Sequence, residues 1–126
     1  MPILELTQKN FDTAIKENDI LLVDFWAPWC GPCRSFAPIY EAAAERYAEI
    51  AFGKVNTEEE QALAGAFQIR SIPTLMIFRE QIILFSQPGM LPPQALDEII
   101  GKIKGLDMDA VREEIRQQEA QANSKP

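Results

Sequence analysis

The sequence has no histidine and only two cysteines among its 126 residues. A structural zinc site takes four ligands from cysteine, histidine or carboxylate side chains, so a metal site here would need a second subunit or unusual carboxylate ligation. The lack of histidine also excludes a cysteine nucleophile activated by histidine, as in proteases. We therefore expect no metal and no bound cofactor.

Long apolar runs and basic blocks are also missing. The apolar stretch from Ile20 to Trp26 is much shorter than the roughly 20 residues that span a bilayer, and Asp24 interrupts it. With a net charge of −7 and scattered basic residues, the chain is expected to bind neither nucleic acid nor membranes. The first ten residues, MPILELTQKN, lack the features of a secretory signal, which predicts a cytoplasmic location.

The hydrophobic pattern predicts one α/β domain. A continuous apolar run over Ile20 to Trp26 is typical of a strand covered on both faces. Two further strands, Thr74 to Arg79 and Ile82 to Ser86, are so close in sequence that they must form an antiparallel hairpin. The remaining predicted elements are a short helix capped by Asn10, a long helix after Gly31, a strand over Ala51 to Asn56, a helix starting at Thr57, a helix from Pro93 to Gly105, and a short C-terminal helix lined by Met108, Val111 and Ile115 before a polar, frayed end. This order predicts a central mixed sheet with helices on both faces.

Both cysteines lie in the segment WCGPC, at the start of the predicted long helix. Residues three apart in a helix are close enough for a disulfide to form and open with little backbone motion. At the helix start, free N–H groups and the helix dipole stabilise the thiolate of Cys30, and Cys33 is positioned to resolve a mixed disulfide. Two inert buried cysteines remain the alternative.

A carboxylate in the buried strand is the second unusual feature. Burying Asp24 is costly unless it is paired or protonated, so we expect a raised pKa and a role in proton transfer. The structural alternative is that Asp24 faces a polar strand end or pairs with Lys54 of the neighbouring strand, and the two interpretations are compatible.

The segments VDFWAPWCGPC and SIPTLMIF, together with Gly89, resemble the thioredoxin family from about Leu6 to Leu106. The resemblance implies a thioredoxin fold over residues 1–106 and a short helical extension over 107–126. It implies that Cys30 is the nucleophile and Cys33 the resolving thiol. Asp24 would be the acid or base that assists Cys33, with Lys54 nearby.

The same resemblance implies a peptide-binding groove around the cysteine pair. Pro73 would be a cis-proline facing the disulfide, and Ile72 would present its backbone to a bound peptide. The other groove residues implied are Trp29, Gly31, Pro32, Gly89 and Met90. The chain departs from the family in a hairpin turn reading Arg79-Glu80-Gln81, where an Asn-Gly type is common, and in Pro88, where an aliphatic residue is usual.

The implied activity is reduction of protein disulfides through a reversible Cys30–Cys33 disulfide. The implied partner is a thioredoxin reductase, and the enzyme is expected to be a monomer. Thioredoxin itself has a nucleophile of pKa near 7 and a potential of about −270 mV, values that belong to the family and not to this sequence. Gly31-Pro32 between the cysteines and the absence of a nearby histidine favour a reductant. The alternatives are a thioredoxin-fold binding module or co-chaperone that uses the groove and tail, and an oxidase or isomerase of an oxidising compartment.

Overall fold

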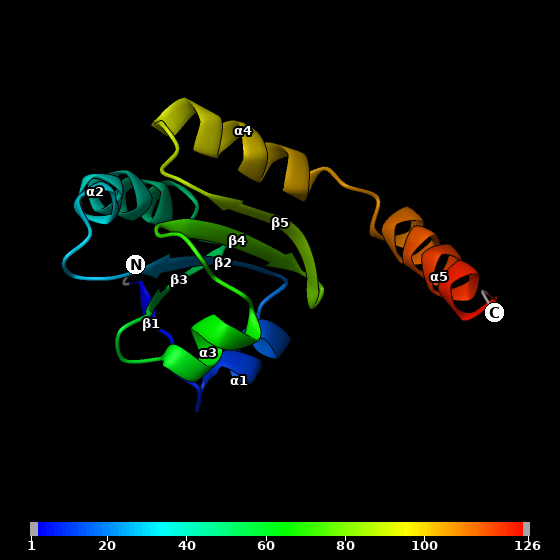
Figure 1. Ribbon diagram of the computed structural model, residues 1–126. Helices are drawn as coiled ribbons and strands as arrows, with labels where there is room; N and C mark the ends of the chain where they lie inside the picture. Colours follow the sequence, from blue (N-terminus) through cyan, green and yellow to red (C-terminus); the bar gives the residue numbers. More distant parts are fainter. Residues whose placement is uncertain (1–2, 125–126) are drawn as a thin grey trace.

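The computed structural model describes residues 3–124 and is built on a five-stranded mixed sheet (Figure 1). The strand order is β1-β3-β2-β4-β5. Strands β1, β3 and β2 are parallel to one another, β4 is antiparallel to β2, and β5 is antiparallel to β4. The strands are β1 (Leu4–Glu5), β2 (Ile20–Trp26), β3 (Ala51–Asn56), β4 (Thr74–Arg79) and β5 (Ile82–Pro88). The predicted mixed sheet and hairpin are therefore confirmed.

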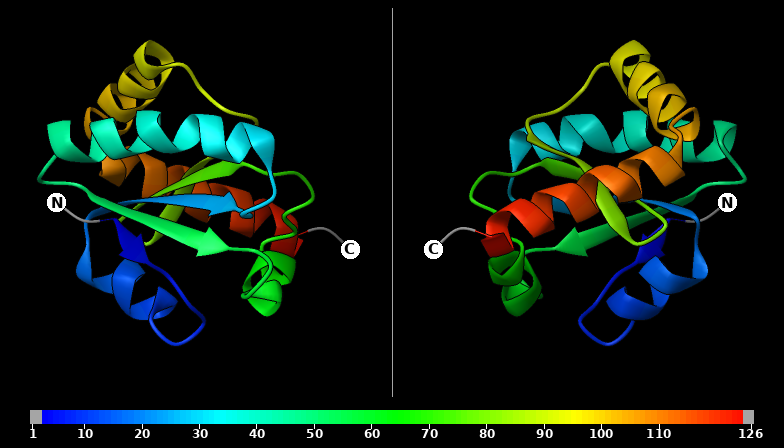
Figure 2. Two further views of the ribbon diagram at one scale, coloured as in Figure 1. Left: turned by 90° about the vertical axis from the view of Figure 1, so that its left-hand side faces the viewer. Right: turned by 90° about the vertical axis from the view of Figure 1, so that its right-hand side faces the viewer.

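Helices cover both faces of the sheet, with α2 and α4 on one face and α1 and α3 on the other (Figures 1 and 2). They are α1 (Phe11–Glu17), α2 (Gly31–Arg46), α3 (Gln61–Ala66), α4 (Pro93–Lys104) and α5 (Met108–Ser124). Strand β2 explains the arrangement: Leu22 packs in the core under α2 and α4, whereas Leu21 and Val23 pack in the core on the other face. None of the helices described here is long and apolar enough to cross a membrane.

Two predicted helix starts are wrong in detail. Asn10 precedes α1, but its side chain makes no cap, because its Oδ1 accepts from the N–H of Thr7 instead (2.7 Å). Thr57 does not begin a helix, and α3 starts only at Gln61. The reason is that the N–H and hydroxyl of Thr57 both donate to the carbonyl oxygen of Trp26, at 2.8 and 3.0 Å.

The two ends of the described chain differ from the sequence predictions, one by an added strand and the other by the length of the predicted helix. Strand β1 was missed, because two residues are too few to show a periodicity. The predicted short helix with a frayed end is instead a helix of 17 residues, α5, which continues to Ser124. Met108 is buried and Val111 and Ile115 are half-buried, as predicted, and the rest of the helix is polar.

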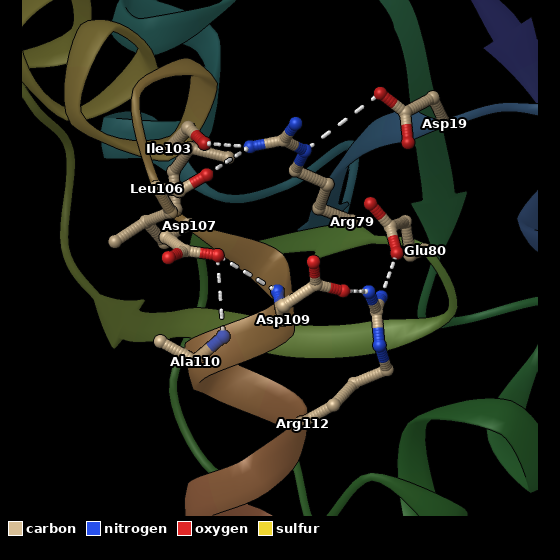
Figure 3. A network of polar contacts seen from close by, with 9 residues as sticks. All are labelled: Asp19, Arg79, Glu80, Ile103, Leu106, Asp107, Asp109, Ala110 and Arg112. Carbon is tan, nitrogen blue, oxygen red and sulfur yellow. Dashed lines mark hydrogen bonds and ion pairs between the residues drawn. The ribbon is translucent and has the colours of Figure 1, made fainter.

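A polar network fixes the start of α5 next to the β4–β5 hairpin (Figure 3). Arg79 donates to the carbonyl oxygens of Ile103 (2.8 Å), Lys104 (3.3 Å) and Leu106 (3.1 Å), where α4 ends. Its Nε reaches Asp19 only as an ion pair at 3.7 Å. In the hairpin turn, Glu80 and Gln81 both have positive φ (51° and 69°).

Side chains of this network also cap the N-terminus of α5 and form ion pairs with its first turns. Asp107 accepts from the N–H groups of Asp109 and Ala110 (3.0 and 3.2 Å). Arg112 bridges Glu80 of the turn and Asp109 of its own helix. The helix thus starts from a fixed point, at the end of the molecule opposite the start of α2 (Figure 1).

Candidate active site

Cys30 and Cys33 form a disulfide at the start of α2, with their Cα atoms 5.2 Å apart. Cys30 is the N-cap residue, and the N–H of Cys33 donates to its Sγ at 3.2 Å. Both side chains are buried in a small cluster with Ala27, whereas Gly31 and Pro32 between them are exposed. The helix thus directs a backbone N–H at the sulfur of Cys30, which stabilises negative charge there.

The segment before β4 faces the disulfide. The peptide bond between Ile72 and Pro73 is cis, and the carbonyl oxygen of Ile72 lies 3.7 Å from Cys30 Sγ. The carbonyl oxygen of Pro73 accepts from the N–H of Gly89 at 2.8 Å, which joins this segment to the end of β5. Gly89 has a φ of 96°, a conformation that residues with a side chain rarely adopt.

Apolar side chains are exposed around the disulfide. Trp29 is 65% exposed and Met90 is 40% exposed, values that are high for large apolar side chains. The indole N–H of Trp29 donates to the carboxylate of Glu58, which follows β3. These residues and the backbone of Ile72 come from four separate segments of the chain.

Asp24 is fully buried in β2, on the face of the sheet that α2 covers. Neither carboxylate oxygen has a hydrogen-bond partner among the described residues. Burial raises the pKa of Asp24 to about 7, although the charge of Lys54 acts in the opposite direction. The carboxyl can therefore both accept and donate a proton near neutral pH.

Lys54 lies beside Asp24 in the register of β2 and β3 but forms no ion pair with it within 4 Å. Its Nζ instead lies over the ring of Trp26, 4.5 Å from the ring centre. Trp26, Lys54 and Asn56 line a pocket of about 260 Å³ with residues of β1. Lys54 therefore acts on the carboxyl of Asp24 through its charge alone, without a direct ion pair.

The model of the family described as thioredoxin matches residues 2–102, which include the whole site. The chain belongs to the thioredoxin family. Its two cysteines therefore form the redox-active disulfide of a thiol-disulfide oxidoreductase, and thioredoxins work without an external cofactor. Among residues 3–124 no group of three or more histidine, cysteine or acidic side chains is placed to hold a metal ion.

Relatives with the thioredoxin name match about four fifths of the chain or more. The putative thioredoxin 2 of Streptomyces coelicolor is 55% identical over 119 residues, which are 94% of this chain and 89% of that one. The thioredoxin of Porphyra purpurea is 40% identical over 104 residues, covering 81% and 97% of the two chains. The Streptomyces match leaves out so little of the chain that it must include most of α5.

Solved thioredoxin structures show the same fold. A mutant thioredoxin from Halobacterium salinarum superposes with a TM-score of 0.76 at 34% identity, covering 82% of this chain and 92% of that one. The thioredoxin of Plasmodium falciparum gives a TM-score of 0.74 at 33% identity, covering 79% and 98%. The thioredoxin fold predicted for this chain is confirmed.

Three residues near the thioredoxin disulfide were not predicted from the sequence. Glu58 binds Trp29, and Arg34 donates to the carbonyl oxygen of Pro28 at 3.1 Å. Tyr40 is a fully buried residue of α2 and donates to the carbonyl oxygen of Gly53 in β3. Glu58 lies within the helix predicted to start at Thr57, and that pattern does not indicate a contact with Trp29. The contacts of Arg34 and Tyr40 have no sequence signal, because their partners are backbone carbonyls.

Proposed function

We propose that this thioredoxin reduces protein disulfides, with Cys30 as nucleophile and Cys33 as resolving thiol. The thiolate of Cys30 attacks one sulfur of the substrate disulfide, forms a mixed disulfide and releases the first substrate thiolate. The thiolate of Cys33 then attacks Cys30 Sγ, releases the second thiolate and leaves the Cys30–Cys33 disulfide. Two electrons pass to the substrate. The observation that carries these roles is the hydrogen bond from the Cys33 N–H to the sulfur of Cys30 at the helix start.

Asp24 is proposed to take the proton of Cys33 during the second step. Its carboxyl lies on the side of β2 that faces the helix of the two cysteines, and its pKa of about 7 suits proton exchange at neutral pH. Lys54 is proposed to favour the ionised carboxylate through its charge.

The groove is proposed to bind an extended segment of the substrate protein. Trp29 and Met90 supply exposed apolar surface, and the backbone next to the cis bond of Ile72 and Pro73 faces the disulfide. Gly31 and Pro32 are exposed between the cysteines, and Gly89 lets the chain turn beside Pro73.

The proposed setting is the cytoplasm, where a thioredoxin reductase returns electrons to the disulfide. A monomer is proposed as the active form. Residues 1–106 are proposed as the catalytic domain and 107–126 as an extension, since the family model ends at residue 102. The net charge of −7 opposes binding to nucleic acid or anionic membranes.

Reduction of insulin with dithiothreitol as electron donor tests the proposal. The reduced protein should accelerate insulin precipitation, and Cys30→Ser should abolish the acceleration. Ser35→Ala, an exposed position on the same helix, is the matched control and should keep full activity. Undiminished activity of Cys30→Ser would contradict the proposal.

A further inference from the structure

Tyr40 is a buried titratable residue to which the chemistry above gives no role. It lies seven residues after Cys33, so the two side chains share one side of α2. The Tyr40 ring packs against Phe36 and Phe52, with ring centres 5.6 and 5.2 Å away. Its hydroxyl donates to the carbonyl oxygen of Gly53 at 2.8 Å.

This hydrogen bond joins the helix of the cysteines to the strand beside Asp24. Gly53 is paired with Val23 in β2, and the next residues in the two strands are Lys54 and Asp24. A Cβ at Gly53 would lie 2.4 Å from Leu6, so the backbone of β3 is held closely against the segment after β1. The carbonyl that receives the Tyr40 hydroxyl is therefore a fixed point.

Few ionisable or charged groups surround Asp24. The N-cap of α2 contributes Cys30, and the helix itself contributes Cys33 and Tyr40. Strand β3 contributes Lys54, which is paired with Glu5 of β1, and the paired residue of β4 is Leu75, which does not titrate. The Nζ of Lys54 lies over the ring of Trp26. Within the described part of the chain both carboxylate oxygens of Asp24 lack a hydrogen-bond partner, so they lie beyond the reach of the Tyr40 hydroxyl while it donates to Gly53. A shift of the ring towards β2 would bring the hydroxyl to this unpartnered carboxylate.

We propose that Tyr40 is a positioning residue of the redox site, which holds the Cys33 side of α2 over Asp24 and, when Asp24 ionises, shifts its hydroxyl from Gly53 to the unpartnered carboxylate. The inference rests on the proposed role of Asp24 as the base for Cys33. Electrostatics agree with this arrangement: burial first, and then the charge of Asp24, raise the pKa of Tyr40. In the structure the hydroxyl donates to Gly53, the arrangement that the proposal assigns to protonated Asp24.

The two sulfur steps can be followed separately with a symmetric nitrobenzoate disulfide, which releases one coloured thiolate at each step. Tyr40→Phe keeps the ring and removes the hydroxyl. We expect the first release, by Cys30, to stay within about twofold of the wild-type rate. The second release, by Cys33, should slow by about threefold to tenfold at neutral pH, because losing the donor raises the pKa of Asp24 and leaves less of the base ionised. Its pH profile should move to higher pH.

Tyr47→Phe is the matched control. Tyr47 is the only other tyrosine of the sequence, it lies at the other end of α2, and its hydroxyl donates to Asp97 of α4. It should leave both releases unchanged. An unchanged second release in Tyr40→Phe, a shift to lower pH, or equal slowing of both steps would overturn the inference.

Two further measurements separate the possible failures. If Asp24→Asn alters the second release and Tyr40→Phe does not, only the role of Tyr40 is wrong. If Asp24→Asn also has no effect, the proposed role of Asp24 fails with it. In case Tyr40→Phe does not fold, the ring carbon resonances of wild-type Tyr40 should titrate with the midpoint of Asp24, and a flat titration would refute the inference.

Discussion

The buried carboxyl of Asp24 should make the protein less stable as the pH rises. Burial raises its pKa from an ordinary value of 3.8 to about 7. Between these two values the unfolded chain has released this proton and the folded chain keeps it. Ionisation of Asp24 therefore does not lower the free energy of unfolding below about pH 4. Above this pH the loss of stability grows, until the pH exceeds about 7.

The size of the effect follows from the two pKa values. Their difference is about 3 pKa units, and each unit is worth 1.36 kcal/mol, so the ionised carboxylate costs the fold about 4 kcal/mol at pH 8. Asp24→Asn removes the titration and keeps the shape of the side chain. The change in the free energy of unfolding that Asp24→Asn causes should be more favourable at pH 8 than at pH 4 by about 3 to 4 kcal/mol.

Urea unfolding of the oxidised protein at about pH 4 and pH 8 measures this difference. Comparing the two pH values cancels the cost of burying an amide, because that cost does not depend on pH. Asp97→Asn is the control of opposite sign: hydrogen bonding to Arg46 lowers the pKa of Asp97, so its contribution is present above its unfolded pKa and is lost in acid. A change below about 1 kcal/mol between the two pH values for Asp24→Asn would refute the reasoning.

Three further predictions concern the fold and the redox couple. Arg79→Ala removes three hydrogen bonds to carbonyl oxygens at the end of α4 and should cost about 2 to 3 kcal/mol in urea unfolding. Arg112→Ala removes only exposed ion pairs and should cost clearly less, so equal losses would contradict this. Gly53→Ala should lower the stability by about 1 to 3 kcal/mol because its Cβ would overlap Leu6, and Gly101→Ala, in open space on α4, should raise it by up to about 1 kcal/mol; a neutral Gly53→Ala would show that β3 can shift. Equilibration with glutathione should give a potential near the thioredoxin value of about −270 mV, and one near −120 mV would indicate an oxidant instead.

The chemistry of the site was predictable because its signals are local in the sequence. Cys30 and Cys33 are three residues apart, so helix geometry alone brings them to disulfide distance. Asp24 interrupts an apolar strand, and burial of such a strand fixes the direction of the pKa change without any coordinates. The cis bond before Pro73 came from the family resemblance, because sequence alone favours the trans form.

The features that were missed depend on contacts between distant segments. Thr57 resembles a helix cap, but the carbonyl of Trp26, 31 residues earlier, takes its N–H and hydroxyl. Tyr40 looks like an ordinary core residue until Gly53 provides its acceptor. The turn at Glu80 and Gln81 adopts positive φ without glycine or asparagine. The ion pair between Arg112 and Glu80 joins this turn to α5, a helix that was predicted but whose position beside the hairpin was not.

The central claim is that Cys30 attacks and Cys33 resolves. Its most direct test is to mix the reduced Cys33→Ser and Cys30→Ser variants with a disulfide-containing substrate protein and to analyse the products by non-reducing mass spectrometry. The account predicts that Cys33→Ser accumulates a stable mixed disulfide through Cys30, and that Cys30→Ser forms little or none. A mixed disulfide that accumulates through Cys33 in Cys30→Ser, with none in Cys33→Ser, would contradict it.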